Sequence, residues 1–254
     1  MIDKELQKKL LSIPAIATYI GTAIGIWGIV KDKQNLTIIT LLVLVSILLG
    51  YLYQVYGKYK YFKRYKIIDS EFHRLSHRTR DMVTLMRCAS EKQEVMSFTE
   101  AATRNALTVA SNTFKTITGF DCTASLMIKQ NNNRLKTTWY CHNSDPQRES
   151  QESTYLELND GVAGEAVSTG CVIVWNNGDT KFKATREDYG KYYSSGISIP
   201  FKSGLEYMGV VNVDSKEIKI FDSKQHQEIG ANIADTIGII FNTQSMWEEL
   251  NDKR

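Results

Sequence analysis

The stretches Ile13–Val30, IPAIATYIGTAIGIWGIV, and Leu36–Tyr56, LTIITLLVLVSILLGYLYQVY, decide how this chain is organised. They run for 18 and 21 residues without a charge. At roughly 1.5 Å of rise per residue, each is long enough as a helix to cross a hydrocarbon core of about 30 Å. Backbone amides in lipid must be satisfied within the segment, so both stretches predict α-helices. The short linker, residues 31–35, predicts a transmembrane helical hairpin. A signal peptide is the alternative for the first stretch, but no small-residue cleavage site precedes the second, more apolar one.

Lysines and arginines set the expected orientation of this hairpin. Both outer flanks are basic, whereas the tip holds only Lys31 and Lys33, partly offset by Asp32. Positive flanks stay cytoplasmic, which predicts a multi-pass protein of a bacterial inner membrane with both termini in the cytoplasm. The flanking cations are Lys4, Lys8 and Lys9 before the hairpin, and Lys58, Lys60, Lys63, Arg64 and Lys66 after it.

The net charge of +3 hides an asymmetry along the chain. Residues 1–66 hold 10 Lys and Arg against 3 Asp and Glu, a net +7, and the remaining 21 against 25 give −4. The basic excess would meet anionic headgroups at the membrane boundary. A net-acidic remainder argues against a general nucleic-acid binder. Cys88, Cys122, Cys141 and Cys171 have no zinc spacing and should be reduced in a cytoplasmic domain.

Two features predict a homo-oligomer. Ala17, Gly21 and Gly25 lie four residues apart in the first span, a pattern that lets helix backbones approach closely. The alternative is that they pack the hairpin against itself. The connecting helix 67–96 carries a heptad stripe, which predicts either a parallel coiled coil between protomers or a seam against the next domain. The stripe is Ile68, Phe72, Leu75, Thr79, Met82, Met86 and Ala89.

Residues 97–254 predict an α+β domain after the hairpin and its basic anchor, 1–66, and the connecting helix. A helix over Phe98–Ile117 is expected to start at the Ser97–Glu100 capping box. The periodicity then changes to that of strands, and Cys122–Lys129 and Arg134–His142 predict a β-hairpin. A turn centred between Asn131 and Asn132 would set Cys122 opposite Cys141, Ala124 opposite Trp139, and Leu126 opposite Thr137.

Three later phrases resemble the GAF family when taken together and in order. Asp160-Gly-Val-Ala-Gly-Glu-Ala-Val, continued by Thr169-Gly-Cys-Val172, is similar to a GAF helix and the strand after it. Gly196-Ile-Ser-Ile-Pro-Phe-Lys and Tyr207-Met-Gly-Val-Val-Asn-Val-Asp-Ser resemble two further strands. The match spans about residues 97–245.

This resemblance implies a six-stranded, mostly antiparallel sheet with helices on one face and a small-molecule pocket on the other. GAF ligands include cyclic nucleotides, bilins, haem and metabolites, and one fold hosts many of them. The Asn-Lys-x-Phe pattern of phosphodiesterase-type cyclic-nucleotide domains is missing. The bilin-attachment cysteine and the cysteine set of the free methionine sulfoxide reductases are not reproduced either.

A polar, tyrosine-rich segment after the strand Val172–Trp175 is the predicted lid of the pocket. Its aromatic rings suit a base, its cations suit phosphate, and its amides and hydroxyls offer hydrogen bonds. The alternative is a solvated loop with its tyrosines packed beneath it. The predicted ligand-binding residues are Trp175, Asn176, Lys181, Arg186, Tyr189, Tyr192, Tyr193 and Ser195.

The sequence therefore predicts a membrane-anchored sensor that is not an enzyme and has no catalytic residues, metal or cofactor. Its ligand would be a nucleotide second messenger that controls oligomerisation of the hairpin, so that the hairpin perturbs the membrane. This layout resembles the two-span effectors of bacterial cyclic-nucleotide antiphage systems. One alternative is a membrane-bound adaptor that signals to a separate kinase or cyclase. Another is a redox enzyme that uses Cys122 and Cys141.

Overall fold

The computed structural model describes residues 20–25, 36–130, 133–141, 155–158, 161–177 and 193–252. The chain divides into two compact units, Met1–Lys66 and Ile67–Arg254. Each unit is described by itself below.

In the first unit, residues 20–25 are helical, and helix α2 (Leu36–Cys88) begins and continues into the second unit. The other residues of the predicted first span lie outside the described part, as do the side chains of residues 36–41 and 43. Among the described residues, no helix combines the length and the apolar character that a membrane crossing requires. A Cβ built at Gly25 or Gly50 would meet nothing within 4 Å.

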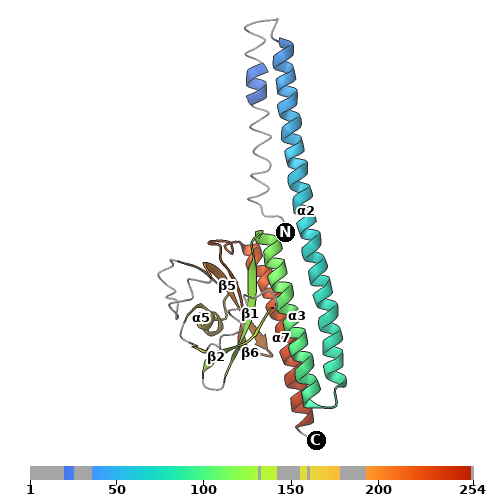
Figure 1. The fold of residues 1–254 in the computed structure, drawn as a ribbon, viewed down its shortest axis with the longest axis vertical. Helices are drawn as coiled ribbons and strands as arrows, with labels where there is room; N and C mark the ends of the chain where they lie inside the picture. The colour runs from blue at the N-terminus through green and yellow to red at the C-terminus, as the bar shows by residue number, and fades with distance from the viewer. Residues whose placement is uncertain are drawn as a thin grey trace. The chain divides into compact units, whose positions relative to one another are not determined.

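The second unit contains one six-stranded sheet and the helices packed on it (Figure 1). The strand order is β3-β2-β1-β6-β5-β4, and every neighbouring pair is antiparallel. The six-stranded antiparallel sheet is the one that the GAF resemblance implies, but helices lie on both of its faces and not on one. The strands are β1 (Cys122–Lys129), β2 (Arg134–Tyr140), β3 (Tyr155–Glu157), β4 (Ile173–Asn176), β5 (Ser195–Ser203) and β6 (Glu206–Ser215).

Helices cover both faces of this sheet. Helices α3 (Lys92–Thr118) and α7 (Lys224–Asn251) lie side by side on one face, and α5 (Gly161–Thr169) lies on the other (Figure 1). The main core lies between the sheet and the α3–α7 pair. Alternate residues such as Ile197, Ile199, Val211 and Val213 supply it from the strands. Strand periodicity therefore separates a helix-covered face from an opposite face, which we call the outer face.

The connecting segment 67–96 is the end of α2, a short connection and the start of α3. Its predicted heptad stripe is the buried side of α2: Leu75 and Met86 are 1% and 0% exposed and belong to core clusters with α3 residues. The stripe thus packs against α3 and α7 within the chain, and the coiled coil between protomers stays a prediction. Helix α3 begins six residues earlier than predicted, because Glu94, not Glu100, accepts from the backbone N–H of Glu91 in a capping box.

The predicted register of the β1–β2 hairpin is wrong. Leu126 lies opposite Trp139 and Met127 opposite Thr137, with a β-bulge between Leu126 and Met127. The connection closes asymmetrically, with the N–H of Gln130 donating to the carbonyl of Arg134 at 2.7 Å and Asn133 at φ 64°. A bulge adds one residue to one strand, and hydrophobic alternation alone does not reveal it.

Candidate ligand-binding site

A row of small polar side chains crosses the outer face of the sheet. Asn212 on β6 lies opposite Ser125 on β1 and Ser198 on β5, and Asp214 lies opposite Thr123 and Gly196. Apolar Val211 and Val213 alternate with these two residues and point into the main core. We call Thr123, Ser125, Ser198, Asn212 and Asp214 the polar row.

The polar row is buried. Ser125 and Asp214 are each 1% exposed, Ser198 is 2% and Asn212 is 7%. The hydroxyl of Ser198 donates to Asn212 Oδ1 at 2.7 Å, which leaves the Asn212 amide N–H groups for other partners. The Thr123 hydroxyl is buried without a hydrogen-bond partner among the described residues. Burying polar groups costs free energy unless they are hydrogen-bonded, so this row is the part of the outer face that we consider for ligand recognition.

An apolar cluster adjoins the polar row on the same face. Met127, Leu135 and Val210 from the sheet pack with Ala163 and Val167 of α5. Helix α5 ends at Gly170, where φ is +67° and the carbonyl accepts from the Tyr207 hydroxyl at 3.2 Å. Apolar surface beside a few convergent polar groups is typical of small-molecule sites.

Trp175 and Gly196 form the edge of the row. They are register partners on β4 and β5. A Cβ at Gly196 would lie 2.7 Å from Asp214 Oδ1 and would overlap the indole Nε1 of Trp175. Trp175 is only 7% exposed. Glycine at 196 therefore lets an indole and a carboxylate approach the same stretch of backbone.

The predicted site residues have different outcomes. Tyr193 is 5% exposed beside β5, and Trp175 lies at the polar row. Asn176 and Ser195 form structural contacts: Asn176 Oδ1 accepts from the N–H of Lys219 at 2.9 Å, and Ser195 Oγ donates to the Glu217 carbonyl at 2.5 Å. The other predicted residues, Lys181, Arg186, Tyr189 and Tyr192, lie outside the described part.

Sequence reasoning missed the polar row, although a signal was present. The run Val210-Val-Asn-Val-Asp214 alternates apolar and polar residues inside a strand that is buried on both faces. Polar residues at period two in a central strand indicate a polar inner surface.

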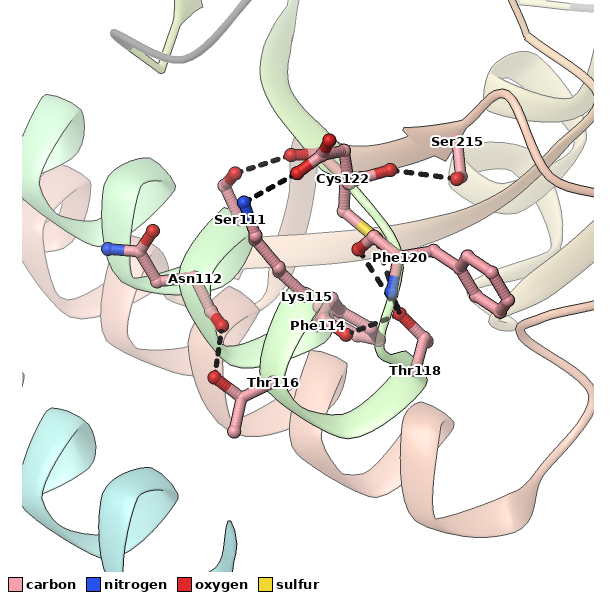
Figure 2. Close-up of polar contacts among 10 residues, drawn as sticks. Ser111, Asn112, Phe114, Lys115, Thr116, Thr118, Phe120, Cys122 and Ser215 are labelled. Atoms are coloured by element: carbon pink, nitrogen blue, oxygen red, sulfur yellow. Dashed lines mark hydrogen bonds and ion pairs between the residues drawn. The ribbon is translucent and has the colours of Figure 1, made fainter.

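Cys122 lies on the helix-covered face, beside Thr118 and Phe120 (Figure 2). Burial raises the pKa of Cys122 to about 12. Its Sγ donates to the Phe120 carbonyl at 3.5 Å and lies 3.8 Å from the Thr118 hydroxyl oxygen. A thiol needs to be deprotonated to act as a nucleophile, so Cys122 is inert near neutral pH.

The register also separates the two cysteines of the redox alternative. Cys141 follows β2, and its N–H donates to the carbonyl of Ala124, not of Cys122, at 3.0 Å. Ser111 and Ser215 hold the backbone carbonyls of Cys122 and Asp121 at 2.5 Å and 2.8 Å (Figure 2). The backbone around Cys122 thus connects α3, β1 and β6 through hydrogen bonds, which is a structural role.

Metal ligands do not gather in the described part of the chain, where no three His, Cys, Asp or Glu side chains could hold one ion. His73 and His77 are close, with their Nε2 atoms 3.0 Å apart. Arg80 contacts Nδ1 of His77 at 2.9 Å. Arginine can only donate, so Nδ1 of His77 accepts and carries no proton. Metal binding at Nε2 would require a proton on Nδ1, so this contact disfavours a metal at His77.

The described fold is an α+β, GAF-like sheet with helices on both faces. No protein-family model and no curated protein matches the sequence. Solved structures are similar to it at low identity. The GAF domain of an Acinetobacter phosphoenolpyruvate-protein phosphotransferase is 14% identical, with a TM-score of 0.43, over 70% of this chain and 97% of that one.

Two further solved structures have comparable values. The GAF domain of a two-component sensor histidine kinase from Bacillus halodurans is 16% identical, with a TM-score of 0.46, over 57% of this chain and 96% of that one. The free methionine-R-sulfoxide reductase from Neisseria meningitidis is 17% identical, with a TM-score of 0.43, over 62% and 95%. These identities leave the ligand and any activity of this chain open.

Proposed function

We propose that this chain is a membrane-anchored sensor that binds a small molecule on the outer face of its sheet. The buried polar row carries this proposal, because its five polar side chains adjoin an apolar cluster under α5. The row is built on central strands, which hold its side chains in fixed positions. We infer a binding role without chemistry: the polar row holds no cysteine, and burial raises the pKa of Cys122 on the opposite face.

A nucleotide second messenger is the ligand class that we propose to test first. The Asp214 carboxylate accepts hydrogen bonds and the Asn212 amide N–H groups donate them, so the pair suits the polar edge of a base. Trp175 supplies an aromatic ring at the same edge of the row. The phosphate-binding cations would come from Lys181 and Arg186, which remain sequence predictions.

We propose the membrane hairpin as the output. Helix α2 contains residues of both units, from Leu36 to Cys88, so it is the element through which a bound ligand would act. Several described side chains between residues 42 and 55 of α2 are apolar and exposed, as Leu44, Leu48 and Leu52 illustrate at 58%, 56% and 52%. Ligand binding would change how hairpins associate and thereby perturb the inner membrane, with both termini in the cytoplasm.

Thermal denaturation of the reconstituted full chain against a panel of cyclic mono-, di- and trinucleotides tests the ligand. A ligand at about 100 times its Kd adds roughly 2.7 kcal/mol of stability. The variant Asp214→Asn should lose this response, and Thr138→Ala, an exposed hydroxyl on β2, should keep it. A response only to an unrelated metabolite would reject the nucleotide, and an undiminished response in Asp214→Asn would reject the site.

The alternative output is an adaptor that signals to a separate kinase or cyclase. It shares the sensor and the anchor but needs no change in the membrane. Leakage of dye from vesicles that contain the chain, measured before and after ligand addition, separates the two outputs. Ligand-dependent leakage supports the effector, and tight vesicles with bound ligand support the adaptor.

A further inference from the structure

The last part of α2, Ile67–Cys88, contacts the α3–α7 pair through buried apolar side chains at two places; we call these three helices the helix layer. Leu75 joins the main core with Ala106 and Ala110 of α3. Met86 joins a smaller cluster that contains Val95 of α3 and Ile240 of α7. Between these two anchors the buried position of the stripe is a threonine, Thr79, which is 7% exposed.

Four buried threonine hydroxyls on α2 and α3 have no hydrogen-bond partner among the described residues: those of Thr79, Thr99, Thr103 and Thr113. Threonines in helices usually donate to the carbonyl four residues earlier, as Thr84 and Thr108 do at 2.9 Å. Thr103 and Thr99 are 0% and 2% exposed. A buried unsatisfied hydroxyl is costly, whereas valine has the same shape without the polar group.

Thr79 lies on the buried stripe of α2, between its two apolar anchors. Arg78 donates to Asn105 Oδ1 at 2.7 Å, which places the turn of α2 that holds Thr79 beside the turn of α3 that holds Thr103. This hydrogen bond is exposed, so water competes with it. Figure 1 shows this part of α2 alongside α3. Apart from Met82, which packs against the smaller cluster, the middle of the contact is therefore polar.

The end of the segment is fastened more firmly. Helix α2 stops at Cys88, and the indole Nε1 of Trp247 on α7 donates to the carbonyl of Ala89 at 3.0 Å. Lys92 and Glu248 form an ion pair at 3.3 Å next to it. Helix α3 begins at Lys92, only four residues after α2 ends, and Glu94 accepts from the backbone N–H groups of Ser90 and Glu91 in the connection. The connection is a fixed point about which the segment can turn.

We propose that Ile67–Cys88 is a releasable strap, which opens from its Leu75 end and pivots at Ala89. Opening lets water reach the hydroxyls of Thr79 and Thr103, so these two residues favour the open state relative to an apolar seam. Elements that move in switching proteins come from the least stable parts of the fold. The device belongs to the helix layer and does not depend on which ligand the sheet binds.

Hydrogen–deuterium exchange of the reconstituted full chain tests this strap. Amides of residues 67–82 should exchange faster than those of residues 106–114 in the core of α3. In the double variant Thr79→Val/Thr103→Val, exchange in residues 67–82 should slow by about tenfold, because the closed state no longer buries two orphan hydroxyls. The control Thr108→Val, whose hydroxyl is satisfied within α3, should leave that exchange unchanged.

A second variant moves the equilibrium in the other direction. Leu75→Ala should speed exchange in residues 67–78 and leave residues 92–96, beyond the pivot, unchanged. Unchanged or faster exchange in the double valine variant would show that the hydroxyls stabilise the closed state, through bound water for example, and would overturn the proposal. Exchange in residues 67–82 as slow as in residues 106–114 would also overturn it.

Discussion

At the scale of single residues, the packing of Trp175 and Asp214 on the outer face depends on the lack of a side chain at Gly196. Gly196 has no side chain, and the space is taken by the indole of Trp175 and the carboxylate of Asp214. Pattern reasoning found Gly196 as part of a GAF-like strand but could not show why glycine stands there. The reason is tertiary, since the two groups arrive from β4 and β6.

Gly196→Ala should destabilise the protein by about 1–3 kcal/mol, because the added methyl overpacks a filled site. It should also weaken ligand binding, since Trp175 and Asp214 must move. Thermal denaturation measures the first effect. Gly50→Ala is the matched control. Gly50 lies inside helix α2, and a Cβ there would meet nothing within 4 Å, so the melting temperature of this variant should not fall. A melting temperature for Gly196→Ala equal to that of the wild type would contradict the packing described here.

His226 at the start of α7 makes stability depend on pH. It is 8% exposed, lies against Phe114 and Phe221, and its Nδ1 has no partner among the described residues. Burial lowers the pKa of His226 below 6.5, although the Phe221 carbonyl and Asp222 act in the opposite direction. Below pH 6.5 the unfolded chain therefore binds a proton that the folded chain resists, and stability falls as the pH drops.

The variant His226→Phe should flatten this profile. Phenylalanine keeps a ring against Phe114 and Phe221 and removes the group that titrates. Melting temperatures compared at pH 7.5 and pH 5.5 give the measurement, with a smaller difference expected in the variant. An equally steep loss of stability in His226→Phe would assign the pH dependence to other groups.

At the scale of elements, sequence patterns located most helices and strands but not their details. Cys122–Lys129 has the predicted bounds, because a turn-rich connection and strand alternation delimit it. Helix α3 starts early because Glu91 and Glu94 form its capping box, and the Ser97–Glu100 pair lies within the helix. The β1–β2 register failed at a bulge that has no sequence signal. Of the predicted site, Trp175 lies at the polar row, whereas the row itself needed the pairing of three strands.

Gly25 tests whether the first helix associates with a second copy. A Cβ at this position would meet nothing within 4 Å, so a larger side chain fits the single chain. If hairpins associate through Gly21 and Gly25, Gly25→Leu should weaken association by about tenfold, because close backbone approach is lost. Cross-linking or light scattering in detergent measures this. Ala23→Leu, at an exposed position, is the control, and equal association in both variants would exclude the glycine contact.

At the scale of the whole molecule, the two units of the chain differ in net charge, which is +7 in residues 1–66 and −4 in residues 67–254. The basic cluster after the second predicted span is exposed on α2, interleaved with Tyr59, Phe62 and Tyr65 at 63%, 65% and 53%. Such a mixture suits headgroups, with cations near phosphates and rings at the interface.

Anionic lipid should therefore be enriched around the reconstituted protein. Each cation near a membrane surface contributes about 1 kcal/mol, so the triple variant Lys60→Gln/Lys63→Gln/Arg64→Gln should lose most of this enrichment. Quenching between labelled anionic lipid and the protein measures it, at low and high salt. Lys224→Gln on α7 is the control, and enrichment that survives the triple variant would remove the basic cluster from the anchor.

The order of strands described above has a consequence for copies crowded on one surface. The two outermost strands, β3 and β4, are the shortest, with three and four residues. A sheet edge offers unpaired amides and carbonyls to any neighbouring chain, and a short edge offers few. The long strands β5 and β6, rich in branched apolar residues, are enclosed within the sheet. If copies gather as proposed, these short edges would give their sheets little backbone through which to join into fibres.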